Sequence, residues 1–268
     1  MRPRTVYRKS PIWLPRVRLF IAAALCGGCV ELPPAGKIKL ADAEKSYRAN
    51  DIRKATQTLD EIIREFPDYK ESALAYYLRA LCHERSDRVV DAGRDVQKCI
   101  ALSTNRVLTA KARAMAGAFY FDSGNVGAAI EQYAKAVDGL PKEPPADMVR
   151  YRYGVCLQRH GEWANARKQF EIVTRDFPNS QAAPWARRML EWRHEFFSVQ
   201  CGVFRDRGAA ASLSARLTSA RLNGWYESQT RDGAAMQVVY SGRHKTYEQA
   251  KSAVASVRRI APDASVAP

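Results

Sequence analysis

The chain has 268 residues, of which 46% are hydrophobic and 26% are charged. This composition allows a packed core and excludes wholesale disorder. The formal charge of +15 favours an anionic partner such as nucleic acid, an acidic polymer or a lipid surface, although a solvated basic surface without a ligand explains it equally well.

The N-terminal segment has the features of an export signal. Basic residues come first, the apolar run Leu19–Leu25 follows, and small residues come next. The run is far too short for a bilayer, which needs ~20 apolar residues, but it suits the hydrophobic part of a signal peptide. An uncleaved tail is the alternative interpretation. We therefore expect residues 1–28 to be a signal peptide.

The small residues end in Gly27–Cys29, which resembles the lipobox of bacterial lipoproteins. The resemblance implies a lipid on Cys29, which anchors the protein to a membrane, and a short tether over residues 29–36. Cys26 is a poorer acceptor because the bulky Leu25 would stand next to the cut. Cleavage by an ordinary signal peptidase is the alternative. Val30 replaces the Asp that retains such lipoproteins in the inner membrane, so the resemblance favours a periplasmic protein on the outer membrane.

A pattern with a period of 37 residues fills the middle of the chain. In each of four segments an alanine is followed by further core residues four and seven positions later, which marks one face of a helix. In three segments a proline then ends the helix. Gly117 and Gly154 stand twelve residues before two of these alanines, where a small residue lets two antiparallel helices approach closely. The four alanines are Ala55, Ala92, Ala129 and Ala166.

This pattern resembles the tetratricopeptide repeat (TPR), whose signature combines a small residue, aromatic residues, an alanine and a final proline. The resemblance implies an α-helical solenoid over residues 37–195, with four repeats and a capping helix that covers the last apolar face. It also implies a binding scaffold whose concave groove accepts a protein partner, which the sequence does not identify. The aromatic residues of the repeats are expected in the core, namely Tyr76, Tyr120, Tyr153 and Trp163.

From residue 196 the pattern changes to strand, helix, strand, strand, helix, strand. In the first strand Val199, Cys201 and Val203 alternate with Gln200 and Phe204. If the first three face the helices, the other two face outward. We expect a small α+β domain over residues 196–268, with a βαββαβ order, a four-stranded antiparallel sheet, two helices on one face and the other face open.

This segment is similar to the SPOR (sporulation-related) domain of bacterial envelope proteins. The similarity rests on an aromatic-x-Val-Gln-x-Gly-x-Phe pattern and on Gly242 after the third strand. The pattern is formed by Phe197, Val199, Gln200, Gly202 and Phe204. The resemblance implies that the open face binds peptidoglycan, specifically glycan strands stripped of their stem peptides.

Five residues are candidates for glycan contact. The amide of Gln200 suits sugar hydroxyls and N-acetyl groups, and Phe204 is expected beside it on the open face. Trp225 and Tyr240 are expected to present flat rings to the sugars, and Arg243 to meet lactyl carboxylates. A solvated strand residue is the alternative for Gln200, and core packing is the alternative for Trp225 and Tyr240.

No catalytic constellation, metal site or cofactor site is recognisable. The four histidines are scattered, and no phosphate-binding glycine loop or nucleophile elbow occurs. The cysteines after residue 30 are expected to be buried thiols. We therefore expect no enzyme, but an envelope scaffold lipoprotein that binds glycan through its last domain and protein through its repeats, in cell division or wall remodelling.

Two other functions fit the pattern less closely. In the first, the protein is an assembly factor for outer-membrane proteins, and its SPOR domain serves only for localisation. In the second it binds nucleic acid, because RNA-recognition modules share the strand and helix order. The second is disfavoured, since no strand carries the basic-Gly-aromatic-Gly-aromatic signature of those modules and an export signal would be unexplained.

Overall fold

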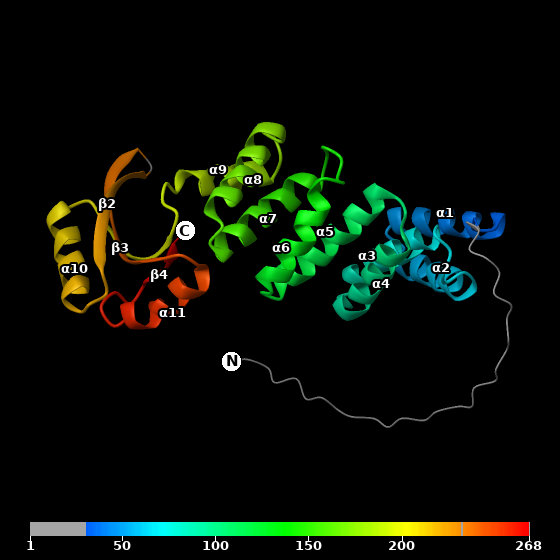
Figure 1. The fold of residues 1–268 in the computed structure, drawn as a ribbon, viewed down its shortest axis with the longest axis horizontal. Helices are drawn as coiled ribbons and strands as arrows, with labels where there is room; N and C mark the ends of the chain where they lie inside the picture. The colour runs from blue at the N-terminus through cyan, green and yellow to red at the C-terminus, as the bar shows by residue number, and fades with distance from the viewer. Residues whose placement is uncertain (1–30, 232, 268) are drawn as a thin grey trace, which may run out of the picture. The chain divides into compact units, whose positions relative to one another are not determined.

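The computed structural model describes residues 31–231 and 233–267, and the predictions of a signal peptide and of lipid at Cys29 lie outside these ranges. Within them, nine helices precede a four-stranded antiparallel sheet that carries two further helices (Figure 1). The predicted fold class is therefore confirmed. None of the described helices has the length and apolar character needed to cross a membrane.

The repeat region consists of four helical hairpins and a final helix. Consecutive helices pack against one another along the whole series. The helices are α1 (Pro34–Arg48), α2 (Ile52–Glu65), α3 (Ser72–Arg85), α4 (Val89–Leu102), α5 (Arg106–Asp122), α6 (Val126–Val137), α7 (Ala146–His160), α8 (Trp163–Asp176) and α9 (Ala182–Glu191).

Local signals set the ends of several of these helices. Asp51 and Asn125 precede α2 and α6, and their side chains accept hydrogen bonds from backbone N–H groups of the first turn. The helix α1 begins at Pro34, within the segment expected to be a tether, because proline at a first helical position loses no hydrogen bond. Leu32, just before this helix, is buried.

The alanines with the 37-residue spacing lie in the cores of the hairpins. Their exposure is 0% for Ala55, Ala92 and Ala129 and 1% for Ala166. A Cβ atom on Gly117 would lie 2.6 Å from the ring of Tyr133, and one on Gly154 would lie 2.6 Å from the ring of Phe170. The prediction that these glycines permit a close approach of paired helices is therefore confirmed.

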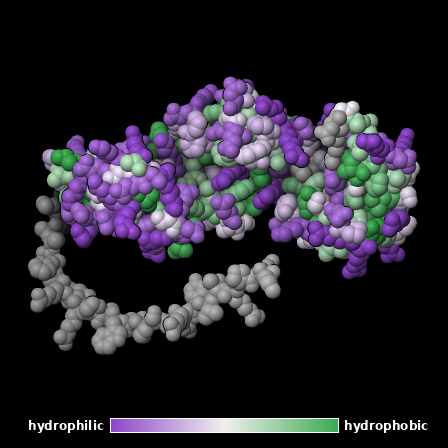
Figure 2. Space-filling view, turned by 180° about the vertical axis from the view of Figure 1, so that it is seen from behind, coloured by the Kyte–Doolittle hydropathy of each residue, from purple (hydrophilic) through white to green (hydrophobic). Residues whose placement is uncertain are grey.

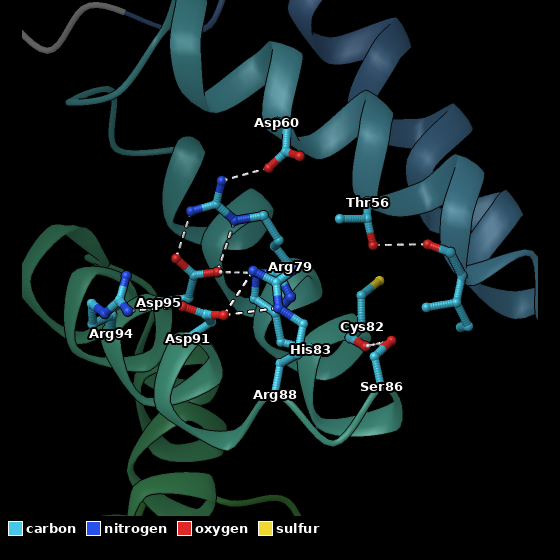
Figure 3. Close-up of polar contacts among 11 residues, drawn as sticks. Thr56, Asp60, Arg79, Cys82, His83, Ser86, Arg88, Asp91, Arg94 and Asp95 are labelled. Carbon is cyan, nitrogen blue, oxygen red and sulfur yellow. Dashed lines mark hydrogen bonds and ion pairs between the residues drawn. The ribbon is translucent and has the colours of Figure 1, made fainter. Parts of the chain in front are cut away.

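A buried polar network joins the first two repeats (Figure 3). Arg79 of α3 donates two hydrogen bonds to the carboxylate of Asp95 in α4, at 2.8 and 2.6 Å, and one to Asp60 in α2, at 2.7 Å. The imidazole of His83 lies 3.5 Å from Asp95. Burial lowers the pKa of His83 below its ordinary value, and Arg88 adds to this shift. The network fixes α2, α3 and α4 to one another.

The later hairpins use a neutral partner where the second uses Asp95. Gln132 and Gln169 stand 37 and 74 residues after Asp95. Each accepts a hydrogen bond from an arginine of the preceding helix, Arg113 at 3.3 Å and Arg150 at 3.0 Å. Each of these hairpins therefore has a polar contact at this position of the repeat, and the partner is a buried carboxylate in the second hairpin and an amide in the third and fourth.

The C-terminal domain has strand order β2-β3-β1-β4. The helices α10 and α11 begin at capped positions, since the side chain of Asp206 accepts from the N–H of Ala209 and Thr246 forms a capping box with Gln249. Both helices pack on the sheet. The elements are β1 (Phe197–Phe204), α10 (Arg207–Ser219), β2 (Gly224–Arg231), β3 (Ala234–His244), α11 (Tyr247–Val257) and β4 (Ser265–Ala267).

The face drawn in Figure 2 carries many hydrophilic residues, with hydrophobic areas on both the repeats and the C-terminal domain. The most exposed large hydrophobic residue of the second hairpin is Val90, at 74%, beside Val89 at 46%. A depression of about 300 Å³ lies next to them, lined by Val89, Val96, Phe119 and Tyr120 among others. The repeats therefore have at least one exposed apolar surface.

Candidate glycan-binding face

Three of the residues selected from the sequence lie in one row across the sheet. Trp225 of β2 pairs with Tyr240 of β3, and Tyr240 pairs with Gln200 of β1. Gln200 pairs in turn with Ser265 of β4. Directly opposite residues of a sheet point to the same face, and the rings of Trp225 and Tyr240 stack with their centroids 4.6 Å apart. The row lies on the face opposite the core beneath α10 and α11.

A β-bulge in β1 changes which residues belong to this face. The register against β3 shifts between Gln200 and Gly202, so that Cys201 and Gly202 both turn toward the helices. Beyond the bulge, Val203 packs with the cluster on the row's side, and Phe204 packs beneath the helices. The expectation that Val203 faces the helices and Phe204 faces outward is therefore wrong, because one extra residue reverses the alternation.

This face is partly covered, and not open as the sequence predicted. Trp192, which follows α9, is 9% exposed, and its ring centroid lies 5.5 Å from that of Tyr240. Its indole N–H donates to the carbonyl of Phe196 at 2.9 Å, and the ring of Phe196 lies 5.9 Å from that of Trp225. Tyr240 is only 1% exposed, which fits the core-packing alternative, whereas Trp225 is half-buried.

Polar groups that the sequence did not single out lie beside the row. The imidazole of His194 lies 2.9 Å from the carboxylate of Glu227. The amide of Gln229 donates to Glu227 and to the hydroxyl of Tyr240, both at 2.8 Å. One sequence signal could have found part of this group, because Trp192, His194 and Phe196 alternate with the period of a strand just before β1.

Arg243 lies at the border of the same face. Its side chain is exposed, and its guanidinium carbon lies 5.3 Å from the ring centroid of Phe196 and 5.5 Å from that of Trp225. Gly242 before it has a φ of 70°, which glycine adopts readily. The carbonyl of Gly242 accepts hydrogen bonds from Ser198 at 2.6 Å and from the indole of Trp225 at 3.1 Å. These contacts fix the position of the backbone next to Arg243.

A cleft of about 560 Å³ lies over this face, and we call it the sheet cleft. Its sheet side includes Gln200, Glu227, Gln229 and Tyr240. Its other side is formed by the end of α9 and the residues that follow, and we call this side the α9 wall. The α9 wall consists of Arg188, Glu191, Trp192, Arg193 and His194. A volume of this size is typical of ligand sites, and amide, carboxylate and aromatic groups converge on it.

The amide, carboxylate and aromatic groups that line the sheet cleft are suited to binding a polar ligand. Burial raises the pKa values of the Cys99, Cys156 and Cys201 thiols to about 12, so that none supplies a thiolate near neutral pH. Over residues 31–231 and 233–267, no group of three or more His, Cys, Asp or Glu side chains could hold a metal ion.

Two family models match the chain. Residues 14–193 match the model described as the N-terminal domain of EccA1, a protein of the T7SS ESX-1 secretion system. The chain belongs to this EccA1 N-terminal domain family. The match begins within the segment expected to be a signal peptide. Residues 194–268 match the SPOR domain model, and this part of the chain is a SPOR domain that follows the TPR-like repeats of the EccA1-type region.

Several solved structures are similar to the chain, at identities of 14 to 18%. YrrB, a TPR protein with an unusual peptide-binding site, is 18% identical with a TM-score of 0.47, covering 59% of this chain and 78% of that chain. PilF of Pseudomonas aeruginosa is 15% identical with a TM-score of 0.47, covering 85% and 93%. PilW, a widely conserved type IV pilus biogenesis factor, is 14% identical with a TM-score of 0.44, covering 87% and 96%. No curated protein matches the chain.

Proposed function

We propose that this protein is a non-enzymatic scaffold of the bacterial cell envelope that binds peptidoglycan glycan strands, in cell division or wall remodelling. The SPOR domain supports peptidoglycan binding as the general activity. The observation that carries the finer proposal is the row formed by Trp225, Tyr240 and Gln200, which brings two aromatic rings and an amide together beside the sheet cleft.

The chemistry of this row matches a sugar polymer. A glycan strand repeats hydroxyl and N-acetyl groups at regular intervals, and an amide side chain both donates to and accepts from such groups. Half-buried Trp225 presents the apolar surface of its ring, while its indole N–H donates to the carbonyl of Gly242. Because Tyr240 is buried, its role is to support the ring of Trp225, which stacks on it. The hydroxyl of Tyr240 accepts a hydrogen bond from Gln229.

Sedimentation with sacculi tests this proposal. The purified protein should sediment with sacculi treated with an amidase, which removes stem peptides, and less with intact sacculi. Gln200→Ala should weaken binding roughly 5- to 150-fold, because the substitution leaves sugar groups without partners at a cost of about 1–3 kcal/mol. Gln57→Ala, at an exposed position of α2, is the matched control and should bind normally.

A thermal melt must accompany each variant. Normal binding by folded Gln200→Ala would remove Gln200 from the site while leaving the domain's activity in place. No sedimentation of the wild-type protein with amidase-treated sacculi would contradict glycan binding itself.

We propose further that Cys29 carries a lipid and anchors the protein in the periplasm, on the outer membrane. The sequence Gly27–Cys29 supports this assignment. A labelled fatty acid should be incorporated into the wild-type protein and not into Cys29→Ser. Equal labelling of both, or loss of label from Cys26→Ser alone, would contradict the assignment.

The repeats are proposed to bind a protein partner, which TPR-like scaffolds do. A competing proposal gives the repeats the main role, in secretion or in assembly of outer-membrane proteins, and leaves the SPOR domain for localisation; the EccA1 family match is the observation that favours it. Deletion of residues 196–268 separates the two. A delocalised protein that still supports secretion or assembly would favour the competing proposal, and loss of envelope function on delocalisation would favour ours.

A further inference from the structure

We propose that two arginines of the α9 wall that precede the SPOR domain supply the cations that select glycan strands without stem peptides. This inference rests on the proposed function and names residues outside the SPOR sheet that determine specificity. These cations are the guanidinium groups of Arg188 and Arg193. The ligand group that they bind is the carboxylate of each lactyl group along the strand.

The α9 wall is fixed to the sheet by several contacts. The ring of Trp192 packs on that of Tyr240. The backbone carbonyl of Trp192 accepts a hydrogen bond from Arg167 of α8 at 3.3 Å. Further along, the indole of Trp163 donates to the carbonyl of Lys245 at 3.1 Å, which joins the start of α8 to the segment after β3. Residues next to Trp192 are therefore held at a set position relative to the sheet row.

Two arginines of the α9 wall are available to a ligand. Arg188 and Arg193 line the sheet cleft and have exposed side chains. Neither forms an ion pair with any residue in the described ranges. The cleft also contains two carboxylates, of which Glu227 lies against His194 and Glu191 is exposed. Arg243 at the border of the face adds a third exposed cation nearby.

The chemistry of the polymer gives these cations a selective role. In an intact strand each lactyl group that carries a stem peptide is an amide and has no charge. Removal of the peptide by an amidase leaves a free carboxylate at that position, and guanidinium groups bind carboxylates through charge-assisted hydrogen bonds. Gln200 and Trp225 would contact sugar groups that both polymers share, whereas Arg188 and Arg193 would contact the group that distinguishes them.

The test compares two chemically matched polymers. Amidase-treated sacculi are used as they are, or after their carboxylates have been converted to neutral methylamides. The wild-type protein should bind the charged polymer more tightly than the neutral one, and the difference should shrink as salt is added. The double variant Arg188→Gln with Arg193→Gln should lose roughly tenfold in affinity for the charged polymer, about threefold for each exposed pair, and little for the neutral one.

Controls use cations outside the cleft. Arg187→Gln removes the neighbouring charge of α9, and Arg216→Gln removes an exposed charge of α10; both should keep the preference of the wild-type protein. If the double variant also keeps that preference, the inference is wrong and glycan binding stands. If the wild-type protein binds neither polymer, the proposed function itself is wrong. Melting curves of the variants show whether each remains folded.

Discussion

The repeat region and the SPOR domain respond differently to one added residue. In a helix an extra residue rotates the following side chains by about 100°, so an apolar stripe is displaced but not inverted. In a strand it turns every following side chain to the opposite face. The bulge at Cys201–Gly202 does this to Val203 and Phe204, whereas Ala55 to Ala166 keep one role over four repeats. The proposed site therefore lies in the region where the face to which a side chain points is hardest to predict from the sequence.

The largest effect on stability is expected in the repeats. The side chain of Arg79 is only 19% exposed. Asp95→Ala would leave its guanidinium with Asp60 as the one remaining carboxylate partner among the described residues. Removing one partner of a buried ion pair costs about 3–5 kcal/mol. Because Arg79 keeps its contact with Asp60, we expect Asp95→Ala to lower the free energy of unfolding by about 3 kcal/mol. Urea unfolding measures the loss.

Asp91→Ala is the control for this experiment, because the contacts of Asp91 with Arg88 and Arg94 are more exposed and should contribute much less to stability. Equal losses in Asp95→Ala and Asp91→Ala would show that burial does not make the network important.

The second effect tests the reversed facing of β1. Phe204→Ala should lower the free energy of unfolding by roughly 2–3 kcal/mol, below the 3–5 kcal/mol of a fully buried Phe, since Phe204 is partly buried beneath the helices. Binding of the folded variant to amidase-treated sacculi should be unchanged. Arg205→Ala, at the next and exposed position, should alter neither property. Lost binding at full stability would mean that Phe204 faces the ligand.

The smallest effect compares buried thiols of the two regions. The pKa of Cys201 rises from an ordinary value of 9 to about 12 on burial, and that of Cys99 in the repeats does the same. Below pH 9 both folded and unfolded chains hold the proton, so these thiols add no pH dependence. Between pH 9 and 12 only the unfolded chain releases it, and stability falls by about 1.4 kcal/mol per pH unit for each thiol.

Removing one thiol should therefore flatten the pH dependence. Urea unfolding under reducing conditions from pH 8.5 to 10.5 should show a slope that is shallower by about 1 kcal/mol per pH unit in Cys201→Ala and in Cys99→Ala, because the unfolded thiol is only partly ionised at the start of this range. An unchanged slope in one variant would mean that its thiol is accessible in the folded protein.

Sequence reasoning recovered the helical repeats because their signals are local and repeated. Gly117 faces Tyr133 and Gly154 faces Phe170 in the same way, so each repeat supports the interpretation of the other. The row of Gln200, Trp225 and Tyr240 was recoverable as a set of residues, but its pairing depends on register across three strands.

Three features of the face were beyond that reasoning. A glycine with a positive φ is a common signal of a bulge, but Gly202 has no positive φ. The packing of Trp192 on Tyr240 joins residues 48 positions apart, on two different domains. The contact of His194 with Glu227 follows from that packing, and no local pattern encodes it.

The indole N–H signals of the tryptophans provide the most direct measurement. The described residues contain Trp163, Trp185, Trp192 and Trp225, which substitutions to Phe would assign. On addition of soluble glycan fragments without stem peptides, the ¹⁵N-indole signals of Trp192 and Trp225 should move as binding proceeds. Trp185, exposed on α9 against Tyr151, should not move. Binding that leaves both Trp192 and Trp225 unmoved would contradict a glycan site on this face.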